Sequence, residues 1–161
     1  MSAGGEVDVF TTANADPAGV YGTVGPVDLN VNKKRDVAYG WRVFDRLRND
    51  YQLNFDTTNA DNARDWVDFD EMSGININAT GTAYLTSDSQ VHYNWKRAPG
   101  FFDVVAYTGD GVAGRTVSHN LGVAPEMIWV KSRNVSGSWR VYHKDIGNTG
   151  GITINLSNAA F

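Results

Sequence analysis

Apolar and polar residues alternate along much of this chain. The alternation is clearest over four stretches, residues 27–32, 51–56, 91–96 and 151–156. A period of two residues is that of a β-strand with one face toward a core and the other toward solvent. Two continuous apolar runs, 101–107 and 127–130, predict strands that are buried more fully.

Segments rich in Gly, Asn, Ser and Thr separate these runs and predict tight turns, as at 78–81 and 108–111. Evidence for helix is confined to 61–66, where Asp61 could cap a single helical turn. We therefore predict an all-β fold, with antiparallel strands arranged in β-sandwich-like units.

The chain also resembles itself at a spacing of about 98 residues. The segment that begins at Arg35 aligns without a gap with the segment that begins at Arg133, and Trp41 falls on Trp139. One inserted residue then aligns 53–60 with 152–159. Because the apolar positions match at alternate residues, the same strands are expected in both copies, and residues 27–44 and 125–142 should form the same strand-loop-strand unit.

The repeat predicts two units, residues 1–101 and 102–161. The second is incomplete, because nothing in it corresponds to 66–69, 75–77, 84–85 or 91–95 of the first. Either the sequence is a segment of a longer polypeptide, or something else completes the second unit. Strand edges and apolar faces left without partners favour association with another chain.

Composition narrows the possible partners. The chain contains no Cys, which excludes disulfides, thiolate metal sites and a cysteine nucleophile. Its net charge of −4, without a long basic stripe, argues against nucleic acid as a partner. No stretch approaches the length of a membrane span, and the first residues do not have the pattern of a secretory signal.

Three segments together resemble a known module. They are Phe101-Phe-Asp-Val-Val-Ala-Tyr-Thr-Gly-Asp-Gly, then 115–133 with the motif His119-Asn-Leu-Gly-Val-Ala-Pro, and then Trp139-Arg-Val-Tyr-His-Lys. This pattern resembles a β-rich module of tail-fibre and virion proteins of marine bacteriophages, cyanophages above all. The similarity covers 36–161 and is strongest over 95–145.

The resemblance implies a structural role in the virion, in a tail fibre or another host-contact appendage, with other virion proteins as partners. It implies no catalytic, cofactor-binding or metal-binding residue. The motif is also explained by structure alone, because Asn120 and Gly122 suit a turn and Pro125 suits the entry to an extended strand.

The residues that could carry chemistry form no recognisable site. We expect His92 on the wetter face of a strand and His119 and His143 at ordinary surface or turn positions. The acidic stretch from Asp61 to Glu71 is the best candidate for a cation, although its spacing fits no calcium loop and a solvated strand face explains it better.

No motif supports an enzyme. There is no Gly-x-Ser-x-Gly and no phosphate-binding loop, and the three Glu single out no carboxylate pair for glycoside hydrolysis. Aromatic side chains could stack on sugar rings, but Trp95, Trp129 and Trp139 lie in apolar phases of their strands and are expected in the core.

The leading hypothesis is therefore a non-enzymatic phage virion protein, with a tail fibre ahead of a capsid or neck decoration. A lectin-like module that reads host surface glycans is the alternative, and a depolymerase is a distant third. A homo-oligomer is expected, with a trimer favoured, because fibres associate around a symmetry axis; the strand at 151–156 should lie near the contact.

Overall fold

A computed structural model describes residues 8–12, 26–72, 74–77 and 90–157, which contain no helix. They form strands that all pair antiparallel, so the fold is all-β as predicted. The strands are β1 (Asp8–Thr12), β2 (Leu29–Lys34), β3 (Arg42–Asp45), β4 (Tyr51–Asn54), β5 (Asn62–Ala63), β6 (Val67–Asp68), β7 (Asn76–Ile77), β8 (Gln90–Trp95), β9 (Met127–Val130), β10 (Arg140–His143) and β11 (Ile152–Thr153). In this part of the chain there is accordingly no segment that could cross a membrane as a helix.

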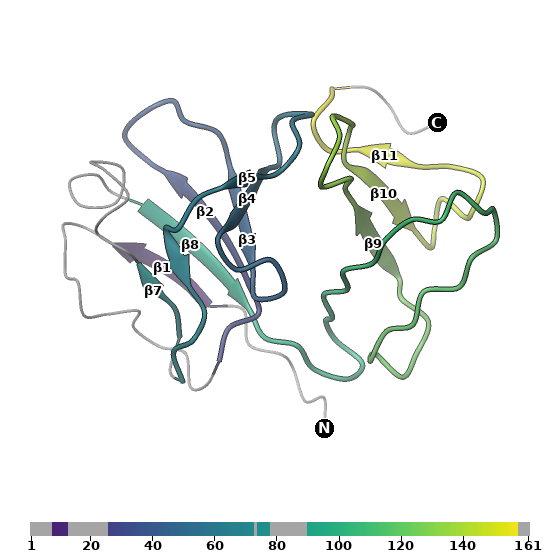
Figure 1. Ribbon diagram of the computed structural model, residues 1–161, viewed down its shortest axis with the longest axis horizontal. Helices are drawn as coiled ribbons and strands as arrows, with labels where there is room; N and C mark the ends of the chain where they lie inside the picture. Colours follow the sequence, from purple (N-terminus) through teal and green to yellow (C-terminus); the bar gives the residue numbers. More distant parts are fainter. Residues whose placement is uncertain (1–7, 13–25, 73, 78–89, 158–161) are drawn as a thin grey trace.

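The first sheet has six strands in the order β1-β8-β2-β3-β4-β5. Strands β2, β3 and β4 form a meander, in which each strand pairs with the next one in the sequence. Strand β8 then pairs with β2 on one side and with β1 on the other. The central strands are therefore bonded on both edges. Figure 1 shows this sheet on the left, with β6 and β7 forming a separate two-stranded sheet against it.

The second sheet has three strands in the order β11-β10-β9 and lies on the right of Figure 1. The predicted hairpin between 127–130 and the strand after Trp139 is confirmed as β9-β10. A shared apolar cluster joins the two sheets, because Trp139 from the second belongs to the same group of buried side chains as Leu29 and Val43 of the first. Two sheets that pack face to face through side chains are the arrangement expected of a sandwich.

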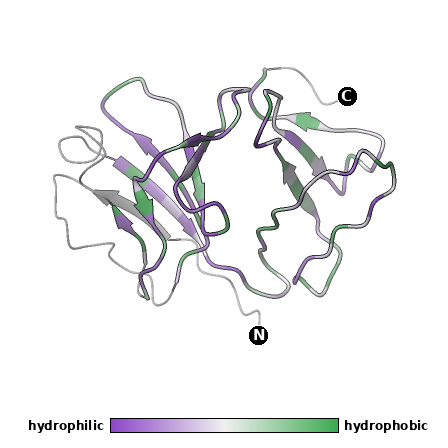
Figure 2. Ribbon diagram, viewed as in Figure 1, coloured by the Kyte–Doolittle hydropathy of each residue, from purple (hydrophilic) through white to green (hydrophobic). Residues whose placement is uncertain are grey.

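The opposite face of the first sheet packs against β6 and β7. Phe44 is fully buried there with Val67 and Phe69. The central strands β2 and β8 are nevertheless coloured toward the hydrophilic end in Figure 2, because most side chains of β2 and every second side chain of β8 are polar. The first sheet thus has one apolar face toward the second sheet and one mixed face toward β6 and β7.

The two hairpins pair in the same register. Val31 lies opposite Val43 in β2-β3, and Trp129 lies opposite Val141 in β9-β10, each 98 residues further on. The third strands correspond as well, once the one-residue insertion is allowed for, with Val43 opposite Leu53 and Val141 opposite Ile152. Trp41 and Trp139 both directly precede their strands, but Trp139 is buried and Trp41 is half-buried. The repeat itself remains a prediction.

Two expectations about secondary structure are wrong. Residues 101–107, predicted as a buried strand, form only an isolated bridge at Phe102, and 105–107 are exposed rather than buried. The segment of the first sheet that lies 98 residues earlier is β1, which pairs with β8. Within the described residues, 103–110 have no strand that corresponds to β8 to pair with. The predicted helical turn at 61–66 instead contains β5, which pairs with Tyr51 and Gln52.

Candidate interaction surface

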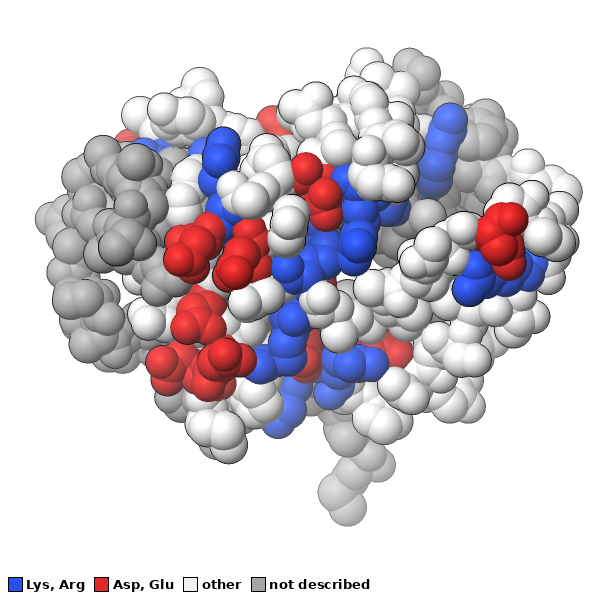
Figure 3. All heavy atoms as spheres, in the orientation of Figure 1, with Lys and Arg blue, Asp and Glu red and all other residues white. Residues whose placement is uncertain are grey.

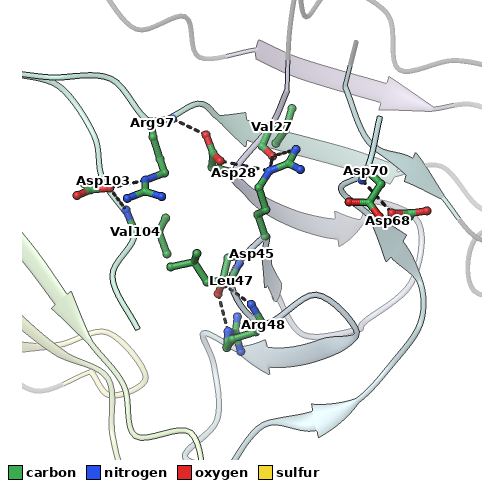
Figure 4. Close-up of polar contacts among 11 residues, drawn as sticks. Val27, Asp28, Asp45, Leu47, Arg48, Asp68, Asp70, Arg97, Asp103 and Val104 are labelled. Atoms are coloured by element: carbon green, nitrogen blue, oxygen red, sulfur yellow. Dashed lines mark hydrogen bonds and ion pairs between the residues drawn. The ribbon is translucent and has the colours of Figure 1, made fainter. Parts of the chain in front are cut away.

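A network of charged groups fixes where the second part of the chain leaves the first sheet (Figure 4). The backbone N–H of Arg97 donates to Asp28 Oδ2 at 2.8 Å, and Arg97 Nε donates to Asp103 Oδ1 at 2.5 Å. Arg46 forms an ion pair with the other oxygen of Asp28 at 3.3 Å. The segment after β8 is therefore tied to the start of β2.

Asp103 also organises the chain that follows. Its Oδ1 accepts from the N–H of Val104 at 2.9 Å, and its Oδ2 accepts from the N–H of Asn120 at 2.7 Å. Burial would raise the pKa of this carboxyl, but the hydrogen bonds from Asn120, Arg97 and Val104 outweigh it and hold the pKa below its usual value. In the turn at 120–122, only Gly122 has the expected positive φ.

A cavity of about 250 Å³ lies beside this network. Its lining consists of Asp28, Arg97, Ala98, Pro99, Phe102, Asp103 and Asn120. The two carboxylates already accept hydrogen bonds from Arg97 and from backbone N–H groups, which satisfies much of their capacity. We interpret the cavity as part of this structural junction.

Trp139 is the main anchor of the second sheet. Its indole Nε1 donates to the carbonyl of Asn54 at 2.6 Å, and its ring lies 4.7 Å from that of Phe55, centroid to centroid. Its backbone N–H donates to Asn155 Oδ1 at 2.9 Å, which connects the start of β10 to the end of β11. The prediction that Trp139 belongs to the core is confirmed.

β9 is much less protected than its sequence suggests. All four of its side chains are 41–49% exposed, although the strand reads Met-Ile-Trp-Val. The expectation of a fully buried strand with Trp129 in the core is therefore wrong. Trp129 touches Phe55 edge-on at 5.3 Å between ring centroids and is nevertheless 43% exposed. An apolar strand exposed on both faces marks an interaction site.

In the first sheet, β2 has the register that β9 has in the second. The face of β2 that is turned away from the second sheet carries Asn30 and Asn32, which are 0% and 1% exposed. Asn30 Nδ2 donates to Asn94 Oδ1 at 2.6 Å and lies 3.2 Å from His92 Nδ1 on the neighbouring strand β8. We call these four residues, Asn30, Asn32, His92 and Asn94, the polar layer.

His92 is therefore buried, at 3% exposure, and the expectation that it lies on the wetter face of its strand is wrong. Burial lowers its pKa to about 4, which keeps the imidazole neutral. The contact with Asn30 Nδ2 requires that Nδ1 be the unprotonated, accepting nitrogen. His119 is exposed and half-buried His143 lies near Asp145, so the structure does not bring the three together.

The acidic stretch is dispersed along β5 and β6. Asp61 lies 4.0 Å from Arg133, and Asp68 accepts from the N–H of Asp70. Among the described residues, no three His, Asp or Glu side chains come close enough to hold a metal ion. In Figure 3 acidic atoms form a group beside a band of Lys and Arg, so the charges on this face neutralise one another locally.

The site that emerges is thus a surface, the β9 surface, formed by Met127 to Val130 and the open edge of their strand. It belongs to an all-β protein whose second sheet is far less covered than its first. A family described as a domain of unknown function (DUF7483) matches residues 100–161, which contain this sheet. No curated protein and no solved structure matches the chain.

Sequence reasoning located this surface only indirectly. The apolar run at 127–130 predicted burial, which is wrong, whereas the repeat, which stays a prediction, raised the expectation of strands without partners.

Proposed function

We propose that this protein is a non-enzymatic structural component of a bacteriophage virion, in a tail fibre or a similar host-contact appendage. The observation that carries an assembly role is the β9 surface, where an apolar strand has an open edge and two half-exposed faces. The assignment to a virion rests on the resemblance of residues 95–145 to a module of marine phage tail-fibre proteins.

The contacts of the charged groups at the junction support a structural role. Its charged groups near the junction, Asp28, Arg97 and Asp103, bond to one another and to the backbone. They hold the second sheet in place, and the carboxylates that line the cavity beside them already accept hydrogen bonds from Arg97 and from the backbone. A sandwich that presents one apolar strand is suited to packing against other proteins.

Immuno-electron microscopy tests the location. Antibodies raised against the folded chain are applied to purified particles of a phage whose genome encodes it. We expect label on the tail fibres, with capsid or neck labelling as the decoration alternative. Particles that carry no label, and no peptides of the chain by mass spectrometry, would refute a virion role.

Carbohydrate recognition is a second candidate, favoured by exposed aromatic rings. Tyr107 is 52% exposed with the Arg115 guanidinium 5.6 Å from its ring, and Trp129 is 43% exposed. Aromatic faces of this kind can stack on sugars. A glycan array with the wild type and the variant Tyr107→Ala tests it: binding that the substitution abolishes supports a lectin, and no binding argues for a purely structural part. A reducing-end assay on bound glycans separates both from a depolymerase.

A further inference from the structure

We propose that the free edge of β9 is a self-association site, at which two copies of the chain pair antiparallel through β9 about a twofold axis. The two three-stranded sheets then become one continuous sheet in the order β11-β10-β9-β9-β10-β11. The inference deepens the structural role proposed above and rests on it, since it names the partner of the β9 surface.

The edge is open in the described part of the chain. β9 pairs only with β10, and none of the other backbone hydrogen bonds there reaches residues 127–130. An unpaired row of N–H and C=O groups on a strand is a template for another strand. Residues 103–110, which lie between β8 and β9 in the chain, form no strand that could pair with this edge.

The first sheet shows what an edge in this position accepts. The hairpin β2-β3 has the same register as β9-β10, and the edge of β2 that corresponds to the open edge of β9 is filled by β8, antiparallel, along all six residues of β2. Within the described residues, no strand of the second sheet stands where β8 stands in the first.

Side-chain polarity then selects the partner. Opposite Asn30 and Asn32, β8 supplies Asn94 and His92, so a polar face meets a polar face. In β9 the corresponding positions are Ile128 and Val130, and the other face carries Met127 and Trp129. A strand that fits this edge must be apolar on both faces, because a buried polar side chain without a partner costs about 1–3 kcal/mol.

A second copy of the chain meets this requirement. Among the described strands, β9 alone is apolar at every position, whereas β8 places Gln, His and Asn on one face. The strand that best fits the open edge of β9 is therefore β9 itself.

Symmetry restricts the register. The twofold axis that relates the two β9 strands stands perpendicular to the sheet, so each face of one β9 continues the same face of the other. Directly opposed residues point to the same face, and because side chains alternate between faces, their residue numbers differ by an even number. A pair centred on Trp129 places Ile128 opposite the partner's Val130. A pair centred on Ile128 would place Glu126 opposite the partner's Val130. The first register sets Met127 opposite the partner's Lys131, whose ammonium donates to the carbonyls of Ser132 and Thr58 and whose aliphatic stem is available to cover Met127, so it is the one we propose.

Cysteine cross-linking tests the register, since the natural chain contains no Cys. The double variant I128C/V130C should form a disulfide-linked dimer under mild oxidation, because each Cys lies opposite the other type in the partner. The single variants I128C and V130C should remain largely uncross-linked, because copies of the same residue are too far apart for a disulfide. No dimer from the double variant, or equal dimer from a single variant, overturns the proposal.

Sedimentation equilibrium of the uncross-linked protein tests the association. The wild type should be a concentration-dependent dimer. Val130→Lys should shift the equilibrium to monomer, with a dissociation constant at least tenfold higher. Val112→Lys is the matched control, because Val112 is 66% exposed but lies outside β9, and it should leave the dimer intact. A wild-type monomer or trimer, or a dimer that survives Val130→Lys, overturns the proposal.

These outcomes separate this inference from the proposed function. A protein found on virions by microscopy but monomeric in solution keeps its structural role and loses the β9 dimer. A β9 dimer of a protein absent from virions keeps the association and loses the virion role.

Discussion

At the residue scale, the centre of the first sheet buries amides where most sheets bury aliphatic groups. Asn32 Nδ2 donates to Asn30 Oδ1 at 2.8 Å, and Asn30 Nδ2 donates in turn to Asn94 Oδ1. A slip of β8 by one residue against β2 would break the bond between Asn30 and Asn94 and place Tyr93 opposite an Asn. The polar layer therefore fixes the register of the central strands.

The first prediction concerns His92 and acid stability. Its pKa of about 4 in the folded protein lies below the value of 6.5 in the unfolded chain. The neutral form is favoured by folding, so this contribution is fully present above pH 6.5 and is lost as pH falls toward 4. Two and a half pKa units correspond to about 3 kcal/mol. Urea unfolding at pH 7, 6 and 5 should show the wild type losing stability more steeply than His92→Gln.

The exposed residue His119 supplies the control for that measurement. His119→Gln should leave the pH dependence unchanged. If His92→Gln and the wild type lost stability in parallel between pH 7 and 5, His92 would not be buried in its neutral form.

The second prediction concerns the anchor Trp139. Trp139→Phe keeps an aromatic ring beside Phe55 but removes the hydrogen bond from Nε1 to the carbonyl of Asn54. The half-buried carbonyl loses its indole donor, and we expect a loss of about 1–2 kcal/mol in the free energy of unfolding. Trp129→Phe, at a 43% exposed position, should cost less than about 0.5 kcal/mol. Urea unfolding followed by circular dichroism at low protein concentration compares them, and equal losses would contradict the anchor role.

At the scale of elements, the alternation of apolar and polar residues was sufficient to locate a strand where that strand has one apolar face. The strands predicted at 27–32, 51–56 and 91–96 lie within two residues of β2, β4 and β8. The β9-β10 hairpin was equally predictable, because Pro125 and the loop at 132–138 delimit it.

Burial was not predictable in the same way, because it depends on neighbours that are distant in the sequence. His92 and Asn94 alternate with Tyr93 as surface residues would, yet both faces of β8 are covered. Conversely, Met127 to Val130 are as apolar as a core strand but have a strand on one edge only. Apolar character shows what a segment can bury, and the packing of distant strands decides whether it is buried.

The third prediction concerns the junction between the elements. Asp103 accepts hydrogen bonds from Arg97 Nε and from the N–H groups of Val104 and Asn120. Asp103→Ala leaves all three donors without this acceptor, and we expect a loss of about 2–3 kcal/mol in the free energy of unfolding. Because folding lowers the pKa of Asp103, the wild-type contribution is present above pH 3.8 and is lost as pH falls below it.

Asp110→Ala is the matched control for Asp103→Ala. Asp110 forms an exposed ion pair with Arg115 at 3.4 Å, and such pairs contribute little. Its removal should change the midpoint of urea unfolding only marginally. A junction variant no less stable than this control would show that Asp103 does not hold the second sheet in place.

At the scale of the whole molecule, the two sheets differ in completeness although they share a register. The first sheet covers its apolar face with Trp139 and its mixed face with β6 and β7. The second sheet contacts the first through Trp139 and Trp129 but leaves β9 half-exposed. Stability and association are therefore linked, because whatever covers β9 also stabilises the fold that presents it.

The last prediction follows from that linkage. If two copies pair through β9, the folded dimer is favoured by mass action, and the melting temperature should rise with protein concentration. Each tenfold increase in concentration above the dissociation constant adds up to about 1.4 kcal/mol per mole of dimer. Val130→Lys introduces a charge at the paired edge, so its melting temperature should not depend on concentration, while Val112→Lys should behave as the wild type does. Calorimetry over a hundredfold range of concentration measures the difference. A wild-type melting temperature that stays constant over that range would mean that β9 faces solvent in the folded protein, and that the missing strand of the second sheet is not supplied by a second copy.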